Sequence, residues 1–262
     1  MTGLLASVTS AAEAETALAA GADIIDLKDP RTGALGALPA PVIREAVARL
    51  AGRRTVSATA GDLPMEPDIV DQAVESIAAL GVDIVKVGLF PGGDREACLD
   101  RLAVRAARGT RLVAVLFADR SPDLGLIEGL ATRGFAGVML DTADKRGGTL
   151  RRHLDDATMA RFVKRARDFG LLSGLAGSLG PEDIAPLLRL GPDYLGFRGA
   201  LCTDGRASAL DADRVRAIRA AIGSAAVQPP SATSAATAAD GAQRAAHSLA
   251  AGSPVSRSAK SM

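Results

Sequence analysis

The chain has 262 residues, of which 48% are hydrophobic and 23% charged, so it can bury a large core in one α/β barrel or in two smaller domains. Its formal net charge is +1 and 3% of its residues are aromatic, which disfavours a basic or base-stacking surface for nucleic acid. No apolar run reaches the roughly 18 to 20 residues that span a bilayer, and no signal-peptide pattern precedes the first expected strand. We therefore expect a cytoplasmic protein that contacts neither membranes nor nucleic acid.

A repeated signature organises the chain: a glycine ends a helical segment and a short apolar strand follows. In chain order we expect a strand over 4–8 and seven more that follow Gly21, Gly52, Gly81, Gly109, Gly134, Gly170 and Gly191. Amphipathic helical patterns lie between the strands, near 10–20, 40–50, 67–80, 94–107, 123–133, 156–169, 182–190 and 209–222.

Regular alternation of strand and helix predicts parallel strands joined by crossover helices. Eight such units favour an α/β fold with a single (β/α)8 TIM barrel over an open sheet, and we assign residues 1–223 to one catalytic barrel domain. Residues 224–262 are rich in Ala, Ser and Pro and lack periodic aliphatic residues, so we expect them to form a disordered tail.

The four clearest copies of the signature predict which side chains point into the barrel. Four and six residues after the glycine, all the side chains are apolar and should pack on the helices. Five and seven residues after it lie the side chains of the opposite face, which in a barrel is the lumen. The polar members of that face are charged and late in their strands, at the mouth where barrel active sites are built: Asp26, Lys28, Lys86, Asp141 and Arg198.

Lysine usage points to amine chemistry at this mouth. The chain has 31 Lys+Arg residues but only five lysines, of which Lys28, Lys86 and Lys145 lie at or just past the ends of apolar runs. A neutral amine can attack a carbonyl carbon, which a guanidinium cannot do. For Schiff-base formation at pH 7, a lysine pKa of about 10.4 must fall by roughly three units, and a second cation nearby contributes to that.

Two structural alternatives apply to the acidic residues. Asp26 could simply neutralise Lys28 as a buried pair, and Asp141 and Lys145 could form a loop ion pair of little energetic value. The sequence leaves open which lysine is the nucleophile. His153 is expected to cap or precede a helix, so no catalytic histidine is predicted.

The ends of the last two strands predict a phosphate site. Gly177 and Ser178 follow the seventh strand, and Arg198 and Gly199 follow the eighth, where barrels often bind phosphate through loop N–H groups. The Arg198 guanidinium could clamp phosphate oxygens or could instead pair with a carboxylate in the lumen. A small phosphosugar is therefore the expected substrate.

Six sequence strings resemble the (5-formylfuran-3-yl)methyl phosphate synthase family of methanofuran biosynthesis: ADIIDLKDP, SATAGDLP, DIVKVGL, MLDTADK, LAGS and RGALC. The resemblance implies a class I aldolase-like lyase that condenses two glyceraldehyde 3-phosphate molecules, with loss of phosphate and water, for a methanofuran-type one-carbon cofactor. It also implies Lys28 as the Schiff-base lysine, Lys86 as the proton-transfer residue, and Asp26, Asp141 and Lys145 as supporting groups. No metal or organic cofactor is implied.

Two other functions remain open at this stage. The pattern Asp26-x-Lys28-x-x resembles part of the D-x-K-x-x-D element of orotidine phosphate decarboxylase-like barrels, but Arg31 stands in the place of the second aspartate. A non-catalytic phosphosugar-binding barrel is the other alternative. The sequence does not decide whether the chain forms a homo-oligomer. Two cysteines, Cys98 and Cys202, offer neither a disulfide framework nor metal-ligand spacing.

Overall fold

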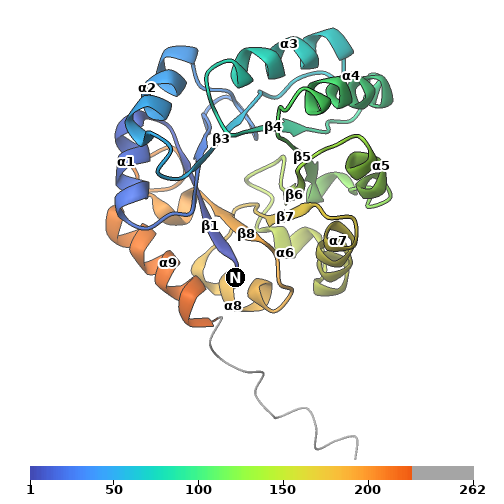
Figure 1. Ribbon diagram of the computed structural model, residues 1–262. Coiled ribbons are helices and arrows are strands. Elements are labelled where there is room, and N and C mark those ends of the chain that lie inside the picture. The colour runs from blue at the N-terminus through green and yellow to red at the C-terminus, as the bar shows by residue number, and fades with distance from the viewer. Residues whose placement is uncertain (226–262) are drawn as a thin grey trace, which may run out of the picture. The chain divides into compact units, whose positions relative to one another are not determined.

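Eight parallel strands close into a barrel in chain order, and β8 pairs with β1 to complete the ring (Figure 1). The structure, a computed structural model, describes residues 1–225. The strands are β1 (Gly3–Val8), β2 (Ile24–Leu27), β3 (Thr55–Thr59), β4 (Ile84–Gly88), β5 (Leu112–Phe117), β6 (Gly137–Asp141), β7 (Leu172–Leu175) and β8 (Tyr194–Phe197). The predicted α/β TIM barrel is confirmed.

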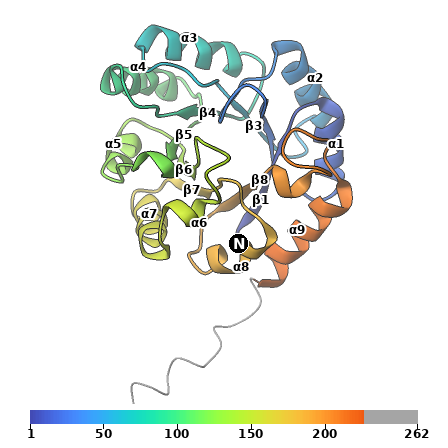
Figure 2. The ribbon, with the colours of Figure 1, turned by 180° about the vertical axis from the view of Figure 1, so that it is seen from behind.

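Helices form a ring around the strands, which is visible from both sides (Figures 1 and 2). The helices are α1 (Ala11–Ala19), α2 (Ala40–Leu50), α3 (Pro67–Ala78), α4 (Arg95–Ala107), α5 (Leu126–Thr132), α6 (Leu150–His153), α7 (Asp156–Asp168), α8 (Pro181–Leu188) and α9 (Ala212–Ala225). The eight predicted helices are present, whereas α6 and the 3₁₀ turns η1 (Ala118–Arg120) and η2 (Gly199–Leu201) were not predicted. These three segments are too short to show a helical period.

The glycine signature has a backbone cause. Gly21 and Gly81 follow α1 and α3 with φ angles of 93° and 85°, a left-handed conformation that a residue with a Cβ atom adopts only at a cost. Each ends its helix and turns the chain toward the next strand. The start of α1 is capped by a side chain: the Oγ of Ser10 accepts the N–H of Glu13 at 3.2 Å.

Two apolar cores flank the strands, as the alternation predicts. The larger core, between barrel and helices, contains all eight side chains assigned to the outer face: Ile25, Leu27, Val85, Val87, Val138, Leu140, Leu195 and Phe197. A smaller cluster fills part of the lumen and includes Leu5, Val113, Val115, Met139 and Tyr194. The inner and outer faces of these four strands are therefore the predicted ones, with the polar mouth residues on the inner face.

Residues 224 and 225, the first two of the predicted tail, belong to α9, and the rest of that predicted tail lies outside the described residues. Among residues 1–225, no helix combines the length and the apolar character required to cross a membrane.

Candidate active site

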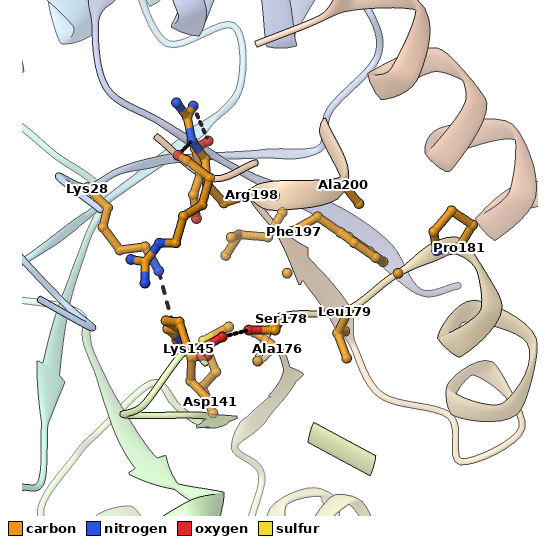
Figure 3. Close-up of a pocket in the computed structure, with 18 of the residues that line it drawn as sticks. Lys28, Asp141, Lys145, Ala176, Ser178, Leu179, Pro181, Phe197, Arg198 and Ala200 are labelled. Atoms are coloured by element: carbon orange, nitrogen blue, oxygen red, sulfur yellow. Dashed lines mark hydrogen bonds and ion pairs between the residues drawn. The ribbon is translucent and has the colours of Figure 1, made fainter. Parts of the chain in front are cut away.

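A cavity of about 410 Å³ opens at the carboxyl ends of the strands, and eight of the nine predicted site residues line it (Figure 3). These eight are Lys28, Lys86, Asp141, Lys145, Gly177, Ser178, Arg198 and Gly199. The ninth, Asp26, is fully buried and lies behind two residues that line the cavity, Lys86 and Ser7. Segments far apart in the sequence thus meet at one mouth because parallel barrel strands all end on the same side.

Asp26 is held by three donors in the interior. Its Oδ1 accepts a hydrogen bond from the Ser57 hydroxyl at 2.7 Å and forms an ion pair with Lys86 Nζ at 2.8 Å, and its Oδ2 accepts a hydrogen bond from the Ser7 hydroxyl at 2.8 Å. Burial alone would raise the pKa of Asp26, but the charges of Lys86 and Lys28 and these hydrogen bonds lower it. Asp26 therefore neutralises Lys86, and the alternative in which it forms an ion pair with Lys28 is not what the structure contains.

Lys28 is placed differently from Lys86. Within residues 1–225 its Nζ donates no hydrogen bond, and its ion pair is a loose one, with Asp141 Oδ2 at 3.8 Å. Asp141 also accepts a hydrogen bond from Lys145 Nζ, so one carboxylate lies between two ammonium groups. Figure 3 shows Lys28 pointing across the cavity toward Asp141 and Lys145.

Burial of Lys28 favours its neutral form. Burial lowers the pKa of Lys28 from 10.5 to about 8; Asp141 and Asp26 oppose this change, and Lys145 and Lys86 reinforce it. For Asp141, burial alone would raise the pKa, but the charges of Lys145 and Lys28 outweigh burial and lower its pKa to about 2. At neutral pH the site thus combines a carboxylate with an amine that loses its proton readily.

Lys145 lies on the loop after β6, and that loop is anchored from β5. Asp119 in η1 accepts the N–H groups of Ala143 at 2.7 Å and of Asp144 at 2.8 Å, which fixes the backbone on either side of the turn. The N–H of Thr142 donates to Asp141 Oδ1 at 2.8 Å. The amine of Lys145 is therefore carried by a loop of defined conformation rather than by a free strand end.

The loops after β7 and β8 face this amine cluster. Ser178 Oγ donates to the backbone oxygen of Lys145 at 3.3 Å, which joins the loop after β7 to the loop after β6 (Figure 3). Within the described residues, no protein acceptor takes the N–H groups of Gly177 and Ser178. Both residues line the cavity, so these N–H groups are candidates to bind an anionic oxygen.

Arg198 is buried, and all five of its N–H groups have protein partners. Its Nη1 donates to Glu13 Oε2 at 2.6 Å and to the Ser7 backbone oxygen at 3.2 Å, and its Nη2 donates to Glu13 Oε1 at 3.3 Å and to the Ser208 oxygen at 2.8 Å. Its Nε donates to the Arg206 oxygen at 2.9 Å. The carboxylate that it pairs with comes from α1, not from the lumen.

Two residues of the site, Ser7 and Arg206, were not predicted from the sequence. Ser7 lies on the inner face of β1, where the alternation in Gly3–Val8 could have identified it as a partner for the lumen charges. Arg206 lines the cavity from the loop after β8, where no periodic pattern indicates its position. Arg31, at the position of the second aspartate in the decarboxylase-like pattern, has a 71% exposed side chain and pairs with Asp29.

A closed barrel of parallel strands with a buried amine and carboxylate cluster at its carboxyl-end mouth defines the class of this protein as a (β/α)8-barrel enzyme. The chain belongs to the 4-HFC-P synthase family, whose family model matches residues 4–219. The resemblance inferred from the sequence strings is confirmed.

Curated relatives match most of the barrel. A Methylorubrum extorquens protein, provisionally named as a (5-formylfuran-3-yl)methyl phosphate synthase, is 47% identical over 81% of this chain and 88% of its own length. The (5-formylfuran-3-yl)methyl phosphate synthases of Methanopyrus kandleri and Archaeoglobus fulgidus are 40% and 38% identical over 77% and 81% of this chain, and over 90% and 95% of their own lengths.

Solved structures share the fold at low sequence identity. Phosphoribosyl anthranilate isomerase from Thermus thermophilus superposes with a TM-score of 0.61 at 17% identity, over 86% of this chain and 99% of that one. Dihydrodipicolinate synthase from Agrobacterium tumefaciens gives 0.59 at 18% identity, over 93% of this chain and 78% of that one. These likenesses concern the barrel fold alone.

Proposed function

We propose that this protein is a (5-formylfuran-3-yl)methyl phosphate synthase, a lyase that condenses two glyceraldehyde 3-phosphate molecules through a Schiff base on Lys28. The product would serve biosynthesis of a methanofuran-type one-carbon cofactor. Family membership and the names of the relatives support the product. The state of Lys28 supports the chemistry.

The observation that carries the proposal is the contrast between the two buried lysines. Lys86 forms a close ion pair with Asp26, at 2.8 Å, whereas Lys28 lies 3.8 Å from its partner Asp141 and has a pKa of about 8. With that pKa, about a tenth of Lys28 is neutral at pH 7, against less than about one part in a thousand for an ordinary lysine. Lys28 is therefore the better nucleophile for an aldehyde carbon.

The proposed steps use the groups around Lys28. Its neutral amine adds to the carbonyl of one triose phosphate and loses water, and the resulting iminium acts as an electron sink while a proton leaves the adjacent carbon. Phosphate then departs with the C–O electron pair. Lys86, held by Asp26, and the Asp141 and Lys145 pair are the groups we assign to proton transfer and charge positioning.

Bond formation with the second triose completes the carbon skeleton. Loss of phosphate leaves an enol on the first triose, whose terminal carbon adds to a carbonyl carbon of the second, and ring closure with dehydration gives the furan aldehyde. The net change is the loss of one inorganic phosphate and two waters from two trioses, with no oxidant or reductant. The N–H groups of Gly177 and Ser178, with Gly199 lining the same cavity, are our candidates for binding the phosphate that is retained.

Borohydride trapping tests the Schiff base. Full-length enzyme is incubated with glyceraldehyde 3-phosphate and borohydride, digested, and examined by mass spectrometry for a stable adduct on the Lys28 peptide. Lys28→Arg keeps the charge but cannot form an imine, so it should lose the adduct and the turnover. Lys164→Arg is the matched surface control, because Lys164 pairs with Asp168 on the exposed side of α7.

Each outcome decides between the candidate functions. An adduct on Lys28, together with released phosphate and a new ultraviolet-absorbing furan, supports the proposal. An adduct found only on Lys86, or on no lysine, contradicts the assignment of Lys28. Carbon dioxide release from a suitable substrate without imine trapping would favour a decarboxylase, and saturable binding that Lys28→Arg leaves unchanged would favour a binding protein.

A further inference from the structure

The loop after β8, residues 199–211, brings a second guanidinium into the cavity. Arg206 lines the same cavity as Lys28, Gly177 and Ser178. Within residues 1–225 its side chain makes one hydrogen bond, from Nη2 to the backbone oxygen of Gly33 at 3.1 Å, and no ion pair. The other N–H groups of Arg206 remain available to a molecule in the cavity, in contrast to those of Arg198.

The surroundings of Arg206 make an anion its expected partner. Burial lowers the pKa of the Arg206 guanidinium, the charge of Arg198 acts in the same direction, and Asp141, Asp62 and Asp29 oppose them from a distance. None of these carboxylates forms an ion pair with it within the described residues. A partly buried guanidinium without a direct counter-ion is stabilised when a phosphate binds to it through charge-assisted hydrogen bonds.

Arg198 and Glu13 fix the loop that carries Arg206. Arg198 donates to the backbone oxygens of Arg206 and Ser208, and Glu13 Oε1 accepts the N–H of Leu210 at 3.0 Å. Three alternate residues of one loop are thus held by one ion pair. The Glu13–Arg198 ion pair thereby orients the Arg206 side chain, so Arg198 is a positioning residue in this arrangement.

We infer that Arg206 binds the phosphate group of a triose phosphate in the cavity, while the Glu13–Arg198 pair holds its loop in place. This inference rests on the proposed function for the identity of the substrate. The Arg206 contact with Gly33 ties the phosphate-binding loop to the loop that follows Lys28. The same side chain therefore sets the distance between the bound phosphate and the carbonyl that Lys28 attacks.

The test compares a phosphorylated with an unphosphorylated aldehyde. Borohydride trapping on Lys28 is measured against concentration for glyceraldehyde 3-phosphate and for glyceraldehyde, in the full-length wild type, Arg206→Gln and Arg206→Lys. Arg206→Gln should raise the half-saturating concentration of glyceraldehyde 3-phosphate by about 10- to 100-fold, the loss expected for one or two charged hydrogen bonds, and leave that of glyceraldehyde unchanged. Arg206→Lys should have an intermediate effect because it keeps the charge but loses the planar fork.

Control variants separate phosphate binding from loop structure. Arg216→Gln makes the same charge change on the exposed face of α9 and should match the wild type with both aldehydes. Glu13→Gln should raise the half-saturating concentration of glyceraldehyde 3-phosphate selectively, although less than Arg206→Gln, because the loop loses its anchor. Equal half-saturation in wild type and Arg206→Gln, or an equal loss with both aldehydes, would overturn the inference.

Inorganic phosphate separates this inference from the proposed function. Calorimetric titration of phosphate into wild type and Arg206→Gln measures the same contact without any Schiff base. Weaker phosphate binding by Arg206→Gln, together with no borohydride-trapped adduct on Lys28 of the wild type, would support the inference and contradict the proposed Schiff-base chemistry. Equal phosphate affinities would reject the inference even if Lys28 were labelled.

Discussion

Replacing Asp141 with asparagine removes the negative charge nearest to Lys28 and tests the electrostatic origin of its reactivity. The carboxylate oxygen lies 3.8 Å from Lys28 Nζ. With an effective dielectric constant of about 20, a charge pair at this distance is worth about 4 kcal/mol, which corresponds to about three pH units. The anion stabilises the ammonium form of Lys28. Its removal should therefore lower the midpoint of the pH–reactivity profile of Lys28 by about three pH units from the wild-type value near 8.

The assay is a pulse of reductive methylation across a pH series, with the extent of methylation of the Lys28 peptide read by mass spectrometry. Neutral amine alone reacts, so the midpoint of the profile reports the pKa directly. The exposed Lys164 peptide provides the internal control and should give the same profile in both proteins. A Lys28 midpoint that stays near 8 or moves upward in Asp141→Asn would refute the electrostatic explanation.

Three other changes test the packing and charge of the barrel. Lys86→Met leaves Asp26 buried and without its closest cation, and should cost about 3 to 5 kcal/mol of the free energy of unfolding in urea. Gly88→Ala should lower the free energy of unfolding by about 1 to 3 kcal/mol, because a Cβ there would lie 2.5 Å from the Phe90 ring. Between pH 8 and 10.5, the free energy of unfolding of the wild type should rise by about 3 kcal/mol relative to that of Lys28→Met. The reason is that the native lysine loses its proton near pH 8, whereas the unfolded lysine keeps its proton up to pH 10.5.

Each of these changes has an outcome that would contradict its physical reason. The double variant Asp26→Asn, Lys86→Met should recover part of the loss, and a double variant as unstable as Lys86→Met would show that charge is not the cause. Unchanged stability of Gly88→Ala would mean that the neighbouring ring moves freely. A stability difference that falls as pH rises would reverse the sign argued for Lys28.

The positions of the mouth residues could be predicted because strand alternation is a local property. The glycine signature fixes where β2, β4 and β6 begin. The alternation of side chains along a strand then predicts the inward orientation of four residues: Asp26, Lys28, Lys86 and Asp141. The outer-face residues of the same strands are buried against the helices, which confirms that register.

The pairings among those residues could not be predicted in the same way. Asp26 and Lys28 lie two residues apart on one strand, within reach of each other, yet Asp26 bonds Lys86 together with two serines from the flanking strands. Which partner is chosen depends on the stagger of the strands around the barrel. The position of Arg206 is harder still to predict, because the sequence of its loop has neither a periodic pattern nor a turn motif that relates it to the lumen.

The cluster of Lys28, Lys86 and Lys145 with Asp26 and Asp141 is electroneutral when Lys28 is unprotonated, and in the reaction we propose, condensation with an aldehyde would convert it to a monocation. Iminium formation is therefore a charging step that takes up one proton from outside the five groups. A dianionic phosphate on the reacting aldehyde offsets the added positive charge within the cavity. The proposed function therefore couples substrate binding to covalent activation through the charge balance of the barrel mouth, and the anionic group would assist the reaction at a carbon to which it is not directly bonded.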